Sequence, residues 1–218
     1  MTMHAEAARE QMIEQQVRAW DVLDERVLAI LRRVPRERFV PPQQRFLAFA
    51  DVAISLPHAQ HMLRPSVAGR LLQALGLSGT ERVLEVGSGS GFLTACLAAS
   101  SRAVRSVEIF PDLAEFARAN LAALSVDNAQ VVNEDALRLP PQTRYEAIAL
   151  TASLPVYDER WQRQLEVGGR LFAIVGEEPI MEARLVRRLS EDTWTSESLF
   201  ETIVDPLRNA RRPEEFSF

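Results

Sequence analysis

The chain of 218 residues contains no lysine, so all 25 of its basic residues are arginines. It therefore has no amine for a Schiff base, no P-loop lysine and no Tyr-x-x-x-Lys pair of the short-chain dehydrogenase type. Cys96 is the only cysteine, which excludes a disulfide within the chain, and nothing in the chain requires an oxidising compartment. We expect Cys96 to be a small buried apolar residue and not a nucleophile.

The sequence also lacks a surplus of basic charge and any long apolar run. A net charge of −5 argues against binding to a nucleic-acid backbone, which needs a concentrated basic surface. No apolar stretch approaches the ~18 residues of a membrane-spanning helix, and the first residues, MTMHAEAARE, do not have the pattern of a signal peptide. We therefore expect a cytoplasmic protein that binds neither nucleic acid nor membrane, with a monomer as the default.

Hydrophobic spacing predicts a helical N-terminal part followed by alternating strands and helices. Two short helices are expected within the first ~45 residues, then an irregular segment at 46–65 and a helix within SVAGRLLQALGL. From Arg82, short β-rich runs alternate with helical stretches, which is typical of parallel βα units. We predict strands at 82–86, 103–109, 129–133, 145–152 and 169–175, helices at about 91–100, 112–124 and 157–166, and two or three antiparallel edge strands in the remainder.

A glycine-rich turn, VLEVGSGSGFLTA (83–95), lies between the first predicted strand and helix of this part. Glycine lacks a Cβ and tolerates positive φ, so Gly87, Gly89 and Gly91 allow close approach of the backbone to a ligand. Glu108 ends the next predicted strand, where a carboxylate can accept hydrogen bonds from ribose hydroxyls. Asp135 follows the third strand, where it could meet an adenine amino group. Three sites at three successive strand ends predict a nucleoside-binding crevice.

The identity of the nucleoside cofactor depends on the spacing of the glycines. The dinucleotide fingerprint G-x-G-x-x-G requires glycine at position 92, where this chain has Phe92. The arrangement from Glu85 to Gly91, E-x-G-x-G-x-G, is the form associated with S-adenosylmethionine, whose bound portion has no pyrophosphate. The sequence thus favours methyl transfer over hydride transfer and disfavours an NAD-dependent oxidoreductase.

Longer stretches make the comparison more specific. They are MIEQQVRAWDVLDERVLAILRRVPRERFVP (12–41), VLEVGSGSGFLTACLA (83–98), the VEI of the second strand, EDA (134–136), LTAS (150–153), QLEVGGRLFAIVG (164–176) and DPL (205–207). Through them the chain resembles the protein-L-isoaspartate O-methyltransferase family over nearly its whole length, and VPRERFVP is the most discriminating match.

The resemblance implies an α/β fold: a Rossmann-like, doubly wound sheet of the S-adenosylmethionine-dependent methyltransferase type with an N-terminal helical extension. We expect one domain over residues 1–218, with the extension and acceptor loop in 1–65 and the cofactor-binding core in 66–218. The implied activity is methyl transfer from S-adenosylmethionine to a carboxylate of L-isoaspartyl residues in damaged peptides or proteins, a form of protein repair.

Position by position, the resemblance also implies the cofactor site. The cofactor loop would comprise Gly87, Ser88, Gly89 and Gly91, preceded by Glu85. Glu108, with Ile109 after it, would hold the ribose, and Asp135 with the backbone of Ala136, which replaces a family glycine, would bind the adenine.

The segment DVAISLPHAQHMLRP (51–65) aligns with the family's acceptor loop but departs from it. Leu63 occupies the position of the family's catalytic serine, and His61 that of a threonine. We predict His61 and Arg64 as catalytic: arginine could bind a carboxylate in bidentate fashion, and histidine could orient an acceptor.

Three alternatives stay open at this segment. The scaffold could use a different acceptor, or the protein could be a non-catalytic S-adenosylmethionine-binding module. In the third, His58, His61 and Arg64 lie on an exposed loop and contact only solvent or glutamate side chains. Two loop histidines without a nearby third ligand predict no metal site.

Overall fold

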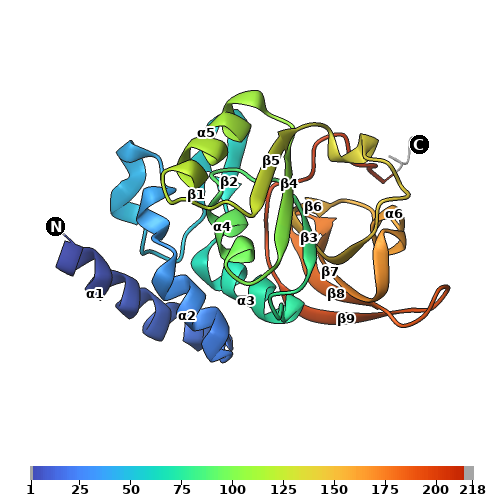
Figure 1. Ribbon diagram of the computed structural model, residues 1–218, viewed down its shortest axis with the longest axis horizontal. Helices are drawn as coiled ribbons and strands as arrows, with labels where there is room; N and C mark the ends of the chain where they lie inside the picture. The colour runs from blue at the N-terminus through green and yellow to red at the C-terminus, as the bar shows by residue number, and fades with distance from the viewer. Residues whose placement is uncertain (1, 214–218) are drawn as a thin grey trace.

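A seven-stranded sheet with the order β5-β4-β3-β6-β7-β8-β9 forms the centre of the computed structural model, which describes residues 2–213 (Figure 1). Strands β4 and β5 lie on one side of β3, and β6 to β9 lie on the other, so the order of the strands switches sides between β3 and β6. Ligands of open α/β sheets bind at such a switch point. The strands β3 (Arg82–Val86), β4 (Ala103–Glu108), β5 (Ala129–Asn133), β6 (Tyr145–Leu154) and β7 (Leu165–Glu177) are parallel. Strand β8 (Ile180–Arg188) pairs antiparallel with both β7 and β9 (Trp194–Glu201).

Both faces of the sheet are covered, which confirms the predicted doubly wound fold. Alternate residues of each strand point to opposite faces: Val83 lies in one buried cluster and Leu84 in the other. The first cluster also contains residues of α3 (Pro65–Leu75), α4 (Phe92–Ala98) and α5 (Pro111–Ala122), and the second contains the fully buried Trp161 of α6 (Arg160–Arg163). No helix within residues 2–213 is both long and apolar enough to cross a membrane.

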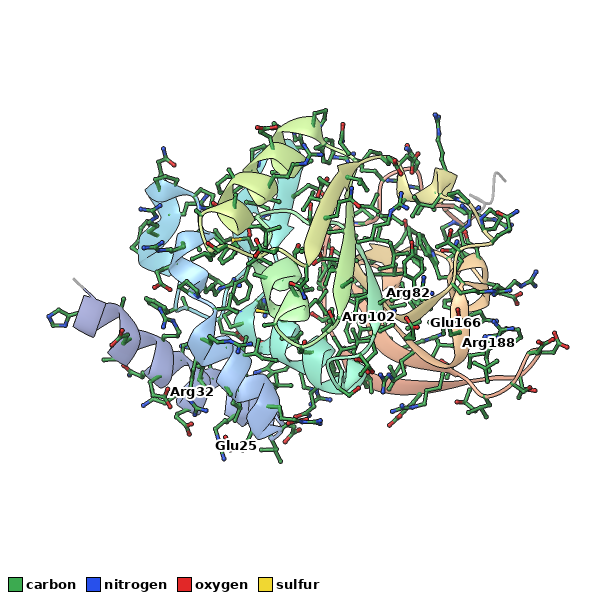
Figure 2. All side chains as sticks on the ribbon, in the orientation of Figure 1. Glu25, Arg32, Arg82, Arg102, Glu166 and Arg188 are labelled. Atoms are coloured by element: carbon green, nitrogen blue, oxygen red, sulfur yellow. The ribbon has the colours of Figure 1, made fainter. Side chains whose placement is uncertain are left out.

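The N-terminal segment is helical, as predicted, and packs on the α3–α5 side (Figure 1). Helix α1 (Thr2–Met12) continues through a π-helical turn (Ile13–Val17) and a short 3₁₀ turn, and α2 (Glu25–Arg33) follows. Figure 2 shows Arg32 and Glu25 on the outer side of this layer, where the Arg32 guanidinium also binds Glu10 and Glu14 at 2.9 Å. Exposed ion pairs of this kind contribute little stability, so the buried apolar side chains of α2 hold the layer to the core.

Two expectations were wrong in detail. Segment 46–65 is not irregular throughout, because Ile54–Leu56 (β1) and Gln60–Met62 (β2) pair as an antiparallel hairpin. Each strand is three residues long, which is too short for an alternating pattern to stand out in sequence. The helix expected at 157–166 is only the four residues of α6, because Leu165 already pairs with Tyr145 as the start of β7.

Candidate active site

A cavity lies at the carboxyl ends of β3, β4, β5 and β6, where the sequence predicts nucleoside binding. The hairpin, the segment after β9, Val67 of α3 and Leu113 of α5 contribute to its other walls. Six of the predicted cofactor residues line it, namely Gly87, Gly89, Glu108, Ile109, Asp135 and Ala136, and so do both predicted catalytic residues, His61 and Arg64.

Glu108 holds its carboxylate at the end of β4, with only 4% of the residue exposed. One oxygen accepts from the backbone N–H of Gly89 at 2.9 Å and the other accepts from that of Phe110 at 3.1 Å. These two bonds fix the carboxylate against the glycine turn. An ionised carboxylate can only accept hydrogen bonds, yet each oxygen has more than one lone pair, so Glu108 can receive hydroxyl donors from a ligand in the cavity.

The three glycines of the turn all have positive φ, of 93°, 51° and 84° for Gly87, Gly89 and Gly91, but they serve different purposes. A Cβ on Gly87 would collide with the hydroxyl of Thr151, which donates to the carbonyls of Val86 and Gly87 at 2.8 Å. A Cβ on Gly91 would lie 3.2 Å from the backbone of Ala117 in α5. Gly91 does not line the cavity, and what the structure shows for it is close packing of the turn against α5.

Glu85 is also displaced from its predicted role, because it lies beneath the turn and outside the cavity. The residue is fully buried, and one of its oxygens accepts from the hydroxyls of Thr94 and Ser106 at 2.5 Å each. These bonds join β3 to α4 and β4. Burial raises the pKa of Glu85 from about 4.5 to about 7, with a smaller contribution from the nearby Glu108 charge, although the two hydroxyls oppose the shift.

The raised pKa predicts that Glu85 makes the fold less stable as pH rises. The buried acid is more readily neutral in the folded state than in the unfolded state, so its stabilising effect is complete below pH ~4.5 and is lost as pH rises through about 7. Replacement by neutral glutamine removes this dependence. We expect the free energy of unfolding of Glu85→Gln, relative to that of the parent protein, to rise by about 3 kcal/mol as the pH is raised from 4 to 8. Urea unfolding measures this difference. The exposed Glu115 of α5 supplies the control, Glu115→Gln, and an equal pH slope in parent and Glu85→Gln would contradict the assignment.

Asp135 and Ala136 lie together where the chain leaves β5. One Asp135 oxygen caps the following turn by accepting from the Leu137 N–H at 3.0 Å, and the other accepts from the Asn209 amide at 3.0 Å. Both residues line the cavity, as predicted. Asn209 was not anticipated from the sequence, because 74 residues separate it from its partner and no local pattern connects them.

His61 and Arg64 both reach the cavity, but in different states. The His61 Nδ1 lies 3.0 Å from the Asp205 carboxylate, which leaves Nε2 as the ring nitrogen available to a ligand. Within residues 2–213 the Arg64 side chain has no hydrogen-bond or salt-bridge partner, and it is exposed. Leu63 packs partly against the core, and its carbonyl accepts from Arg36 at 2.9 Å.

His58 is part of a second cluster at the tip of the hairpin. Its Nε2 lies 2.8 Å from an Asp112 oxygen, and its ring stacks on that of Phe110 with 4.1 Å between centroids. The hydrogen bond from His58 lowers the pKa of Asp112. Both histidines therefore pair with aspartate and not with glutamate, whereas the exposed Arg64 agrees with the alternative in which the loop contacts solvent. Among residues 2–213, no group of three or more histidine, cysteine, aspartate or glutamate side chains is arranged to hold a metal.

The hairpin tip carries backbone strain that glycine would relieve. His58 and Ala59 adopt left-handed φ values of 63° and 53°, which cost an L-residue roughly 1 kcal/mol or more. His58 has compensating contacts, whereas Ala59 has only a methyl group. We expect Ala59→Gly to stabilise the protein by about 1 kcal/mol, or roughly 2–4 °C in calorimetry. Ala99→Gly, at a helix end with right-handed φ of −67°, is the control and should not stabilise; a lower Tm for Ala59→Gly would contradict the strain.

Comparisons with known proteins now bear on this geometry. The sequence model of the protein-L-isoaspartate(D-aspartate) O-methyltransferase family matches residues 7–211 of this chain. The chain belongs to this family. It is 41% identical over 92% of its length to a protein-L-isoaspartate O-methyltransferase of Rhodopseudomonas palustris, covering 83% of that protein, and 38% identical over 94% to one of Pelobacter propionicus, covering 92% of it.

A solved structure resembles this family member in fold. A Plasmodium falciparum protein crystallised with S-adenosyl-L-homocysteine superposes with a TM-score of 0.80 at 20% identity, covering 94% of this chain and 98% of the other. The predicted family and fold class are thereby confirmed. The other readings left open at Leu63, a different acceptor or a non-catalytic module, are not favoured by these relatives.

Proposed function

We propose that this protein transfers a methyl group from S-adenosylmethionine to the free carboxylate of L-isoaspartyl residues in damaged peptides or proteins. Family membership supports the activity. The two relatives are named protein-L-isoaspartate O-methyltransferases, and the match to this chain covers most of their length. The observation that carries the proposal is one cavity that brings together the Glu108 carboxylate, the Asp135–Ala136 turn and the cationic Arg64. A nucleoside and an anionic acceptor can therefore meet in one place.

The lining residues suit the cofactor. Glu108 would accept from the ribose hydroxyls, Asp135 and the Ala136 backbone would contact the adenine, and Gly89 would allow the backbone to approach the amino-acid end. A Cβ at Gly89 would meet only one atom within 4 Å, the Leu56 Cδ1 at 3.2 Å, so this side of the turn is left free by the protein. When bound, the cofactor supplies a sulfonium methyl group as the electrophile.

The protein's part in the reaction is mainly orientation. A carboxylate with a pKa near 4 is already ionised at pH 7, so no strong general base is needed. Arg64 can hold the carboxylate through its exposed guanidinium, and His61, fixed by Asp205, borders the same space. Leu63 offers no hydroxyl, so these two side chains would replace the family serine.

The decisive test compares acceptors. Purified protein with labelled S-adenosylmethionine should methylate an isoaspartyl peptide well above the level seen with the same peptide containing ordinary aspartate. Background transfer to the isoaspartyl peptide, by protein that binds S-adenosylhomocysteine normally, would sink the repair assignment.

Calorimetric titration tests the cofactor separately. S-adenosylhomocysteine should bind and NADH should not, since Phe92 replaces the third glycine of the dinucleotide fingerprint. The proposal includes a cytoplasmic setting, which the single buried Cys96 supports because no disulfide requires an oxidising compartment, and a monomer as the default state. Light scattering during the titration measures the oligomeric state.

A further inference from the structure

A second, smaller cavity lies beside the first, between the glycine turn and the end of the hairpin at Met62 and Leu63. Its volume is about 40 Å³, enough for a few water molecules or one carboxylate group. It shares His61, Leu63, Gly87 and Gly89 with the larger cavity, so a ligand could extend from one to the other. Its own wall adds Arg36 and Ser88.

Arg36 is a buried cation, and no carboxylate among the described residues forms an ion pair with it. It is only 1% exposed, donates to the Leu63 carbonyl at 2.9 Å and lies 4.8 Å above the ring centroid of Phe92. Its Nε is buried and has no hydrogen-bond partner within the described residues. Burial lowers its pKa to about 10, so the guanidinium remains charged at neutral pH. Buried charges are costly unless they are paired, and an incoming anion would offset this cost.

Ser88 supplies a second unpartnered group to the same cavity. The residue is 5% exposed, and its hydroxyl is buried without a hydrogen-bond partner in the part of the chain that the structure describes. None of the described residues that line the cavity is acidic. A cationic donor, a free hydroxyl and room for a few atoms specify a small anion that accepts hydrogen bonds.

We propose that Arg36 and Ser88 form a carboxylate subsite. This assignment rests on the proposed function. The carboxylate belongs either to the amino-acid end of the cofactor or to the acceptor, and a carboxylate from either source is recognised in the same way. Arg36 thus provides an anion-binding arginine in addition to Arg64, from a buried position in the VPRERFVP stretch.

Two ligands that differ at the amino-acid end separate the sources. S-adenosylhomocysteine carries the carboxylate, whereas 5′-methylthioadenosine lacks the amino-acid end. If the cofactor supplies the carboxylate, Arg36→Gln weakens S-adenosylhomocysteine binding by roughly 10- to 100-fold in calorimetry and leaves methylthioadenosine binding unchanged. If the acceptor supplies it, both affinities stay unchanged and the KM for an isoaspartyl peptide rises by a similar factor.

The controls address folding and structural effects. Arg33→Gln is the matched control, because Arg33 also donates to a backbone carbonyl, that of Ala99 at 3.1 Å, but does not line this cavity. Ser88→Ala leaves the guanidinium in place and should weaken the same ligand by roughly 3- to 10-fold, so it decides the matter if Arg36→Gln fails to fold.

Two results would overturn the subsite. One is equal weakening of both nucleosides by the Arg36 and Ser88 variants, which indicates a structural role; the other is no change in either affinity or in the peptide KM. Failure of the parent protein to bind S-adenosylhomocysteine at all would instead overturn the proposed function.

Discussion

Glu108→Ala should lower the affinity for S-adenosylhomocysteine by at least ~100-fold while the protein remains folded. Each hydrogen bond from a ribose hydroxyl to a carboxylate is worth about 1.5–3 kcal/mol, and this side chain can accept two of them. The carboxylate is also held in place before binding by the N–H groups of Gly89 and Phe110, so little ordering is needed when the ligand enters. Calorimetric titration measures the loss directly.

The control for Glu108 removes a carboxylate nearby but outside the cavity. Glu115 lies on α5 with 82% of its side chain exposed, and Glu115→Ala should bind as the parent protein does. Glu108→Gln keeps one acceptor oxygen and should show a smaller loss than Glu108→Ala. A change of less than roughly threefold for Glu108→Ala would remove Glu108 from the cofactor site.

Loss of both His61 and Arg64 should reduce kcat/KM for an isoaspartyl peptide by roughly 100-fold, with each single alanine variant losing about 10-fold. The two side chains are the ionisable groups that the hairpin and its exit contribute to the cavity wall beside Leu63, which cannot bind the acceptor's carboxylate itself. Binding of S-adenosylhomocysteine should not change, because the effect belongs to the acceptor. Steady-state kinetics with the cofactor at saturation makes the measurement.

Two further variants sharpen this result. Asp205→Asn should reproduce part of the His61→Ala loss, since Asp205 fixes the imidazole at 3.0 Å. Arg45→Ala removes an exposed arginine outside the cavity and should be neutral. Unchanged kinetics in the His61 and Arg64 double variant would show that the acceptor is held elsewhere, for which Arg36 and Arg208 are the remaining cations in the two cavity walls.

The parallel core could be predicted closely from sequence, and the reasons are local. Each strand from β3 to β5 is a short β-rich run bounded by turn residues, and the predicted and observed ranges agree to within one residue. The glycine turn, Glu108 and Asp135 follow from strand ends that must lie along the same edge of a parallel sheet. Such features depend on spacing within a few tens of residues.

The contacts that could not be predicted connect distant parts of the chain. Asp205 and His61 are 144 residues apart, and the sequence around neither residue indicates that the two are in contact. Glu85 was misplaced for a different reason: sequence locates it beside the cofactor loop, but a strand residue points to one face or the other, and this one points into the core. Whether a strand residue points into the core or toward the ligand cavity can be decided only from its burial in the folded structure.

The segment after β9 determines when the cavity is completed during synthesis of the chain. Asp205 pairs with His61, Arg208 donates to the His58 carbonyl at 3.1 Å, and Asn209 donates to Asp135 at 3.0 Å. The ribosome can finish the central strands β3–β6 well before it adds these residues. A nascent chain could therefore have its glycine turn and Glu108 in place while the wall of the cavity is still missing, and full ligand affinity should arise only after residue 209 has been synthesised and has left the exit tunnel.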